Sequence, residues 1–173
     1  MMGKGKILMV CGGIVTLISV YVLAWYAFDI NYFTYYINGI GGIKNIPNII
    51  FHAQSYATYL GIPVWIIYVS IVIIILTLIT GVVQILAVKN RILGILGSII
   101  PLLFGIMIIV GFEVSPEWIN FFQIFGDRNP LIAEGFPLNL EIPGRPESLG
   151  TYTLIFGGIL GIIGYYYSKE EIF

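Results

Sequence analysis

Two long apolar runs lie between Val64 and Val110, in the stretch VWIIYVSIVIIILTLITGVVQILAVKNRILGILGSIIPLLFGIMIIV. The run before Lys89 contains no charged residue, and neither does the run after Arg91. Each run exceeds the roughly 20 apolar residues that an α-helix needs to cross a bilayer. Only the turn Lys89-Asn90-Arg91 separates them, so the two predicted helices must lie side by side and run in opposite directions.

The composition of the whole chain agrees with a membrane protein. Of the 173 residues, 58% are hydrophobic and 10% are charged, and the mean hydropathy is +0.97. Soluble domains carry about 25% charged residues. The net charge of -1 leaves no basic stripe for nucleic acid. The single cysteine, Cys11, excludes an intramolecular disulfide and a redox thiol pair.

The predicted fold class is an all-α membrane protein, a single domain with four spans in an antiparallel bundle. We expect the spans at residues 7–27, 62–88, 92–112 and 149–167, with long loops at 28–61 and 113–148. The first span is longer than the apolar part of a signal peptide, and no A-x-A-like site follows it. Trp25 and Tyr26 end it, as interfacial aromatic residues do.

Small and polar residues in the spans predict how the helices pack. The pairs Gly94/Ser98 and Gly157/Gly161 each have the small-xxx-small spacing that lets two helices approach closely. No ionisable residue occurs within a span, which argues against a transporter or an ion channel. The few polar side chains are expected to bond back to their own helices. They are Ser70, Thr77, Thr80, Gln84, Ser98, Thr151 and Thr153.

The loop at 28–61 is aromatic and carries little charge. Gly39, Gly41 and Gly42 are expected to interrupt it. Asn45 and Pro47 are plausible helix-start residues, and apolar residues recur after them at helical spacing. We therefore predict a short amphipathic helix here, lying at the membrane interface or packed over the bundle.

The loop at 113–148 is acidic and rich in proline. Ser115-Pro116-Glu117 predicts a helix start, and Gly126 predicts its end. Four aromatic residues share one broad face of this helix: Trp118, Phe121, Phe122 and Phe125. That face is a candidate interaction surface, or alternatively an inner face that covers the bundle or dips into the headgroups. Alternating residues from Leu138 to Ile142 predict a short strand.

The distribution of lysine and arginine predicts the orientation. Lys4, Lys6, Lys89, Arg91 and Lys169 lie close to span ends, and cations near span ends favour the cytoplasm. The protein is therefore expected in the cell membrane, with both termini in the cytoplasm and both long loops on the extracytoplasmic side.

Few residues in the sequence could form a catalytic, cofactor-binding or metal site. His52, Glu113 and Glu117 form the best polar candidate, since paired carboxylates can do acid–base work. The alternative interpretation is that the two glutamates cap a helix and solvate the loop, and that His52 is simply an interfacial residue. A zinc or copper site needs three or four ligands, and His52 has no obvious companions. No catalytic residue, cofactor or metal is predicted.

Three functional hypotheses remain open. The first is a non-catalytic membrane protein that acts through interaction with other membrane subunits or itself, as an accessory subunit or a surface contact protein. The second is a membrane enzyme or a lipid- or quinone-binding protein that uses His52 and the outer carboxylates. The third is an oligomeric pathway for a neutral solute.

The plan of a short inner turn and two long outer loops resembles the topology of claudins and tetraspanins. The claudin loop signature pairs a tryptophan with two cysteines, and the tetraspanin loop carries Cys-Cys-Gly. Because this chain has no loop cysteine, the resemblance stops at topology and we name no family.

Overall fold

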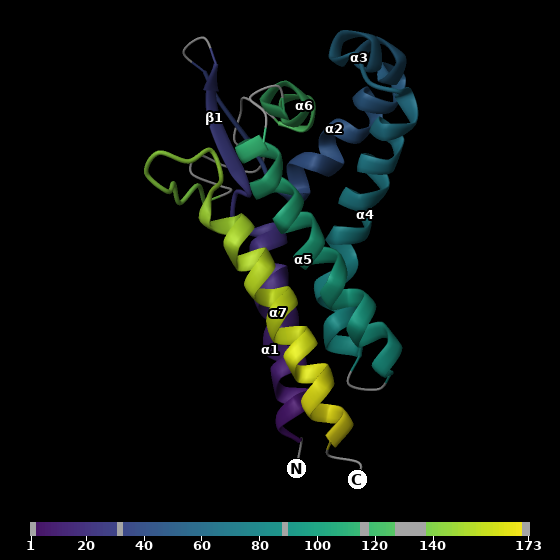
Figure 1. Ribbon diagram of the computed structural model, residues 1–173, viewed down its shortest axis with the longest axis vertical. Coiled ribbons are helices and arrows are strands. Elements are labelled where there is room, and N and C mark those ends of the chain that lie inside the picture. Colours follow the sequence, from purple (N-terminus) through teal and green to yellow (C-terminus); the bar gives the residue numbers. More distant parts are fainter. Residues whose placement is uncertain (1–2, 31–32, 88–89, 115–117, 127–137, 171–173) are drawn as a thin grey trace.

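The computed structural model describes residues 3–30, 33–87, 90–114, 118–126 and 138–170. Four of its helices are long and apolar enough to cross a membrane, which is compatible with a multi-pass membrane protein. They are α1 (Lys4–Tyr21), α4 (Val64–Leu86), α5 (Arg91–Val114) and α7 (Leu149–Glu170). Figure 1 shows the chain ends at one end of these helices and the remaining elements at the other. The end away from the chain termini is called the outer end of the bundle, as a label of position within the molecule alone. The last three predicted spans agree with the structure to within a few residues.

The first span differs from the prediction at its outer end. Helix α1 ends at Tyr21, and the chain then turns into the strand β1 (Tyr26–Ile30). Trp25 and Tyr26 are buried rather than interfacial. The indole N–H of Trp25 donates to the Ser19 carbonyl at 3.1 Å, and the Tyr26 hydroxyl donates to the Phe122 carbonyl at 2.7 Å. Because both polar groups find protein partners, both rings can be buried completely.

The first long loop forms a hairpin and two helices. Strand β1 pairs antiparallel with β2 (Phe33–Ile37). Helix α2 (Gly39–Phe51) follows at once, and α3 (Ala53–Leu60) completes the loop. The sequence predicted one helix here and no strands.

We predicted that Gly39, Gly41 and Gly42 interrupt this loop, and this prediction is wrong because all three lie within α2. Gly39 is the first residue of α2, and the side chain of Asn38 caps the helix by accepting from the Gly41 N–H at 2.9 Å. A Cβ atom on Gly39 would lie only 2.6 Å from the Leu78 side chain of α4. Glycine is therefore needed for close packing, and this outweighs its low helix propensity. Pro47 lies inside α2, not at its start.

Helix α6 (Trp118–Phe125) fills the space between α4 and α5 near their outer ends. Figure 1 shows α4 and α5 diverging there, with α2 and α6 between them. The rings of Phe121, Phe122 and Phe125 are buried. They leave a void of only about 10 Å³ beside Ser70 of α4 and Phe104 of α5. Such a void holds at most one water molecule, so the outer helices form part of the packed core.

Glycines bring the backbones of α1 and α7 together. A Cβ atom on Gly12 would lie 2.8 Å from the Gly157 carbonyl oxygen and 2.9 Å from the Gly161 nitrogen. On α5, a Cβ atom on Gly94 would lie 3.2 Å from the side chains of Ala87 and Met9. Gly94, Gly157 and Gly161, the glycines of the two small-xxx-small pairs, therefore lie at close approaches between elements.

A buried polar network centred on Gln84 joins all four long helices. Its carbonyl oxygen accepts from the Thr16 hydroxyl of α1 at 2.9 Å. Its amide nitrogen lies 3.3 Å from the Ser98 hydroxyl of α5 and 3.4 Å from the Gly157 carbonyl of α7. Ser98 in turn donates to the Gly94 carbonyl at 2.6 Å. Gln84, Thr16 and Ser98 are completely buried, so the network is a satisfied structural core.

The other polar residues in the spans divide into two groups. Four of them donate to carbonyls of their own helices, as predicted: Ser70, Thr77, Thr80 and Thr153. Thr151 of α7 differs, because its hydroxyl donates to the Trp25 carbonyl. This contact ties the outer end of α7 to the chain that enters β1.

Candidate functional site

A small sheet at the outer end of the bundle is the best candidate site. The segment 146–148 adds to the free edge of β1, with Ala27 N–H donating to the Pro146 carbonyl at 2.8 Å and Ser148 N–H donating to the Trp25 carbonyl at 2.9 Å. Glu141 forms a further bridge with Ser148. The predicted strand at Leu138–Ile142 is therefore present only as isolated bridges within the described residues.

Alternation along these strands gives the sheet two different faces. Tyr26, Tyr35, Ile37 and Glu147 point to one face and are buried. One carboxylate oxygen of Glu147 has no hydrogen-bond partner among the described residues. The rings of Tyr26 and Phe122 lie 5.0 Å apart, so this face packs on α6.

The opposite face is polar and hollowed. The turn at residues 142–145 rises beside it, and Gly144 permits that turn with a φ of 78°. The hollow has a volume of about 340 Å³. Its polar lining consists of Asp29, Thr34, Glu141, Arg145 and Ser148.

Hydrogen bonds hold most of these side chains in place. The Thr34 hydroxyl donates to the Asp29 carboxylate at 2.6 Å across the hairpin. The Ser148 hydroxyl donates to Asn139 at 2.6 Å, and the Asn139 amide donates to Glu141 at 3.0 Å. A face whose side chains are already fixed binds a partner with little loss of conformational entropy.

Arg145 links the rim of the hollow to two long helices. Its guanidinium lies 3.0 Å from the Glu113 carboxylate at the end of α5, and both side chains are exposed. A hydrogen bond to Tyr152 of α7 raises the pKa of Arg145, and the charges of Glu113 and Glu147 raise it further. An ion pair between exposed side chains contributes little to stability, so its main effect is to position the guanidinium.

The structure does not assemble the predicted polar site. His52 lies at the corner between α2 and α3, where its ring is 4.9 Å from that of Phe51. Glu113 lies near the end of α5 and pairs with Arg145. Figure 1 shows α3 and the outer end of α5 on opposite sides of α6. Glu117 falls outside the described residues, as does the predicted helix start at Ser115-Pro116-Glu117.

The predicted aromatic surface is largely internal. Phe121, Phe122 and Phe125 are buried, and only Trp118 is partly exposed. This placement fits an inner face that covers the bundle, and it leaves little of the four rings free for docking. Helix α6 ends at Phe125, directly before Gly126, as predicted.

Sequence reasoning did not identify the hollow, because its residues come from two distant loops. The aromatic and β-branched content of residues 26–37 was the available signal for the hairpin. Comparison with protein-family models, with curated proteins and with solved structures finds no match for this chain.

Proposed function

We propose that this chain is a non-catalytic four-helix membrane protein that acts through interaction, as a structural or accessory subunit of a larger membrane complex or as a surface contact protein. The observation that supports this proposal is the polar, hollowed face of the outer sheet. It presents both charge signs, from Asp29, Glu141 and Arg145, on a support that is fixed to the bundle. The rims of protein interfaces are polar in this way.

The rigidity of that support favours recognition of another protein. Trp25 is held by its bond to Ser19, and its carbonyl accepts from both Ser148 and Thr151. The Tyr26 hydroxyl bonds to α6. A pre-formed surface of this kind needs no ordering when a partner binds.

We propose that the sheet lies outside the cell and both termini inside, in an antiparallel bundle, because cations near span ends favour the cytoplasm. Cysteines placed at Asn90 and Asn139, in a chain whose Cys11 is replaced by alanine, test this orientation. We expect a membrane-impermeant maleimide to label position 139 in intact cells, and position 90 only after permeabilisation. Labelling of position 90 in intact cells contradicts the orientation.

Purification from native membranes in a mild detergent tests the function itself. We expect the protein to elute with a stoichiometric partner chain, and the double variant Asp29→Lys/Glu141→Lys to elute without it, because both substitutions reverse charge in the hollow. The control Asn120→Lys adds a positive charge at an exposed position of α6, outside the hollow, and should keep the partner. A wild-type protein that elutes as a monodisperse monomer contradicts the proposal.

A further inference from the structure

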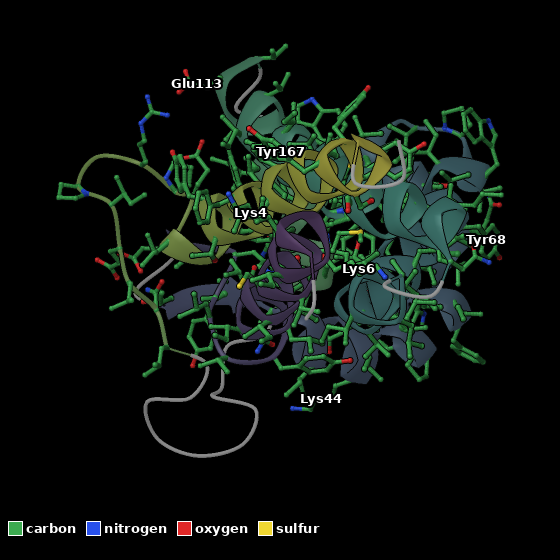
Figure 2. All side chains as sticks on the ribbon, turned by 90° about the horizontal axis from the view of Figure 1, so that it is seen from below. Lys4, Lys6, Lys44, Tyr68, Glu113 and Tyr167 are labelled. Carbon is green, nitrogen blue, oxygen red and sulfur yellow. The ribbon has the colours of Figure 1, made fainter. Side chains whose placement is uncertain are left out.

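The outer end of the molecule has two chemically different sides. From Asn45 to Val88 the sequence contains no aspartate, glutamate, lysine or arginine. This uncharged stretch includes the end of α2, all of α3 and all of α4. Figure 2, seen along the bundle, places Glu113 and Tyr68 on opposite sides of the molecule. In Figure 1 the strand β1 of the charged sheet and the helix α3 likewise lie on opposite sides of the molecule.

The uncharged side exposes large aromatic residues. Phe51 is 84% exposed, Tyr59 is 72% exposed and Trp65 is 61% exposed. Removing a large aromatic side chain such as Phe51 from water is favourable. Three such residues on one corner of a protein therefore indicate an apolar or amphipathic partner.

Helix α3 is held firmly at this corner. Ala53 and Ala57 are its buried residues, and they belong to the cluster that packs on α4. Gly61 ends the helix in the left-handed conformation, with a φ of 65°, and Pro63 then caps α4. Only this short connection separates α3 from a span, so α3 lies where that span leaves the bilayer.

The exposed aromatic residues continue the lipid-facing surface of α4. Val69, Val72 and Ile75 are exposed apolar residues of that helix, and Trp65 and Tyr68 lie beyond them towards its outer end. Tryptophan and tyrosine are enriched where spans meet the headgroups. Phe51 at the end of α2 and Tyr59 of α3 extend this exposed surface beyond the end of α4.

We propose that α3 and the end of α2 rest in the headgroup region of the bilayer, as a platform that binds a neutral lipid surface through Phe51, Tyr59 and Trp65. Charged headgroups are not needed, because the platform carries no charge. The proposal goes beyond the proposed function and does not depend on the identity of any protein partner.

Fluorescent labelling in vesicles tests this placement. Single cysteines at Phe51 and Tyr59, in the Cys11→Ala chain, carry an environment-sensitive fluorophore in phosphatidylcholine vesicles. Reference labels are placed at Ile75, which faces lipid, and at Glu141, which lies in the outer hollow. We expect labels at 51 and 59 to be quenched most by lipids with a nitroxide on the headgroup, and the label at 75 most by lipids with a nitroxide on the acyl chain. The label at 141 should respond mainly to dissolved iodide.

Two results overturn the proposal, and they have different meanings. If iodide quenches labels at 51 and 59 as strongly as the label at 141, then the corner lies in water. If neither the lipid nitroxides nor iodide quench them, then protein covers the corner, either a second copy or another chain. The labels replace exposed residues, so the fold should be retained, and circular dichroism checks this.

Discussion

We expect Gly12→Leu to lower the stability of the bundle more than the loss of any polar contact between its helices. Gly12 lies at a close approach of α1 and α7, where even a Cβ atom is 2.8 Å from the backbone oxygen of Gly157. The obstructing atoms belong to the α7 backbone, so no side-chain rotation relieves the clash, and the helices must separate. Overpacking of a well-packed core costs up to about 3 kcal/mol. Unfolding of the purified protein in mixed micelles with increasing SDS measures this loss.

Cys11→Leu is the matched control for this substitution. Cys11 precedes Gly12 on α1 and is exposed, so leucine at position 11 adds the same bulk on a surface with no backbone against it. We expect its unfolding midpoint to equal that of the wild type. Equal midpoints for Gly12→Leu and the wild type contradict the close crossing of α1 and α7.

We expect Gln84→Leu to have the second largest effect. The substitution removes the contacts of Gln84 with Thr16, Ser98 and Gly157, which belong to three different helices. Hydrogen bonds between helices in a membrane average about 0.6 kcal/mol each. We therefore expect the free energy of unfolding to fall by about 2 kcal/mol, measured by the same SDS titration.

Thr77→Val controls for the loss of a buried polar group. Thr77 is as buried as Gln84, but its hydroxyl donates to the Ile73 carbonyl of its own helix. We expect a loss well below that of Gln84→Leu, because no contact between helices is removed. If Gln84→Leu is no less stable than Thr77→Val, then the Gln84 network does not stabilise the bundle.

Apolar run length was sufficient to predict four helices that are long and apolar enough to cross a membrane, because such a helix needs little besides length and hydrophobicity. The first span was predicted to continue to residue 27, but α1 ends at Tyr21. Trp25 and Tyr26 continue the apolar run of α1, yet their side chains bond to Ser19 and Phe122, and the chain leaves the helix before them. Hydropathy cannot distinguish a residue buried in lipid from one buried in protein.

The interior contacts were less predictable because they join distant residues. Gln84 and Thr16 are 68 positions apart, and nothing local to either predicts their bond. Helix propensity gave the wrong prediction at Gly39, because close packing against Leu78 places this glycine in a helix despite its low propensity. The outer hollow combines Asp29 with Glu141, so it exists only once the loops have folded.

Site-directed photo-crosslinking in native membranes tests whether the polar face of the outer sheet contacts another protein. A benzophenone amino acid is placed at Asp29 or Glu141, and at Val72 or Ile79, exposed apolar residues of α4, as references. We expect a discrete adduct of higher mass from positions 29 and 141 and none from positions 72 and 79. Protein adducts from positions 72 and 79 with none from positions 29 and 141 contradict an interaction role for this face.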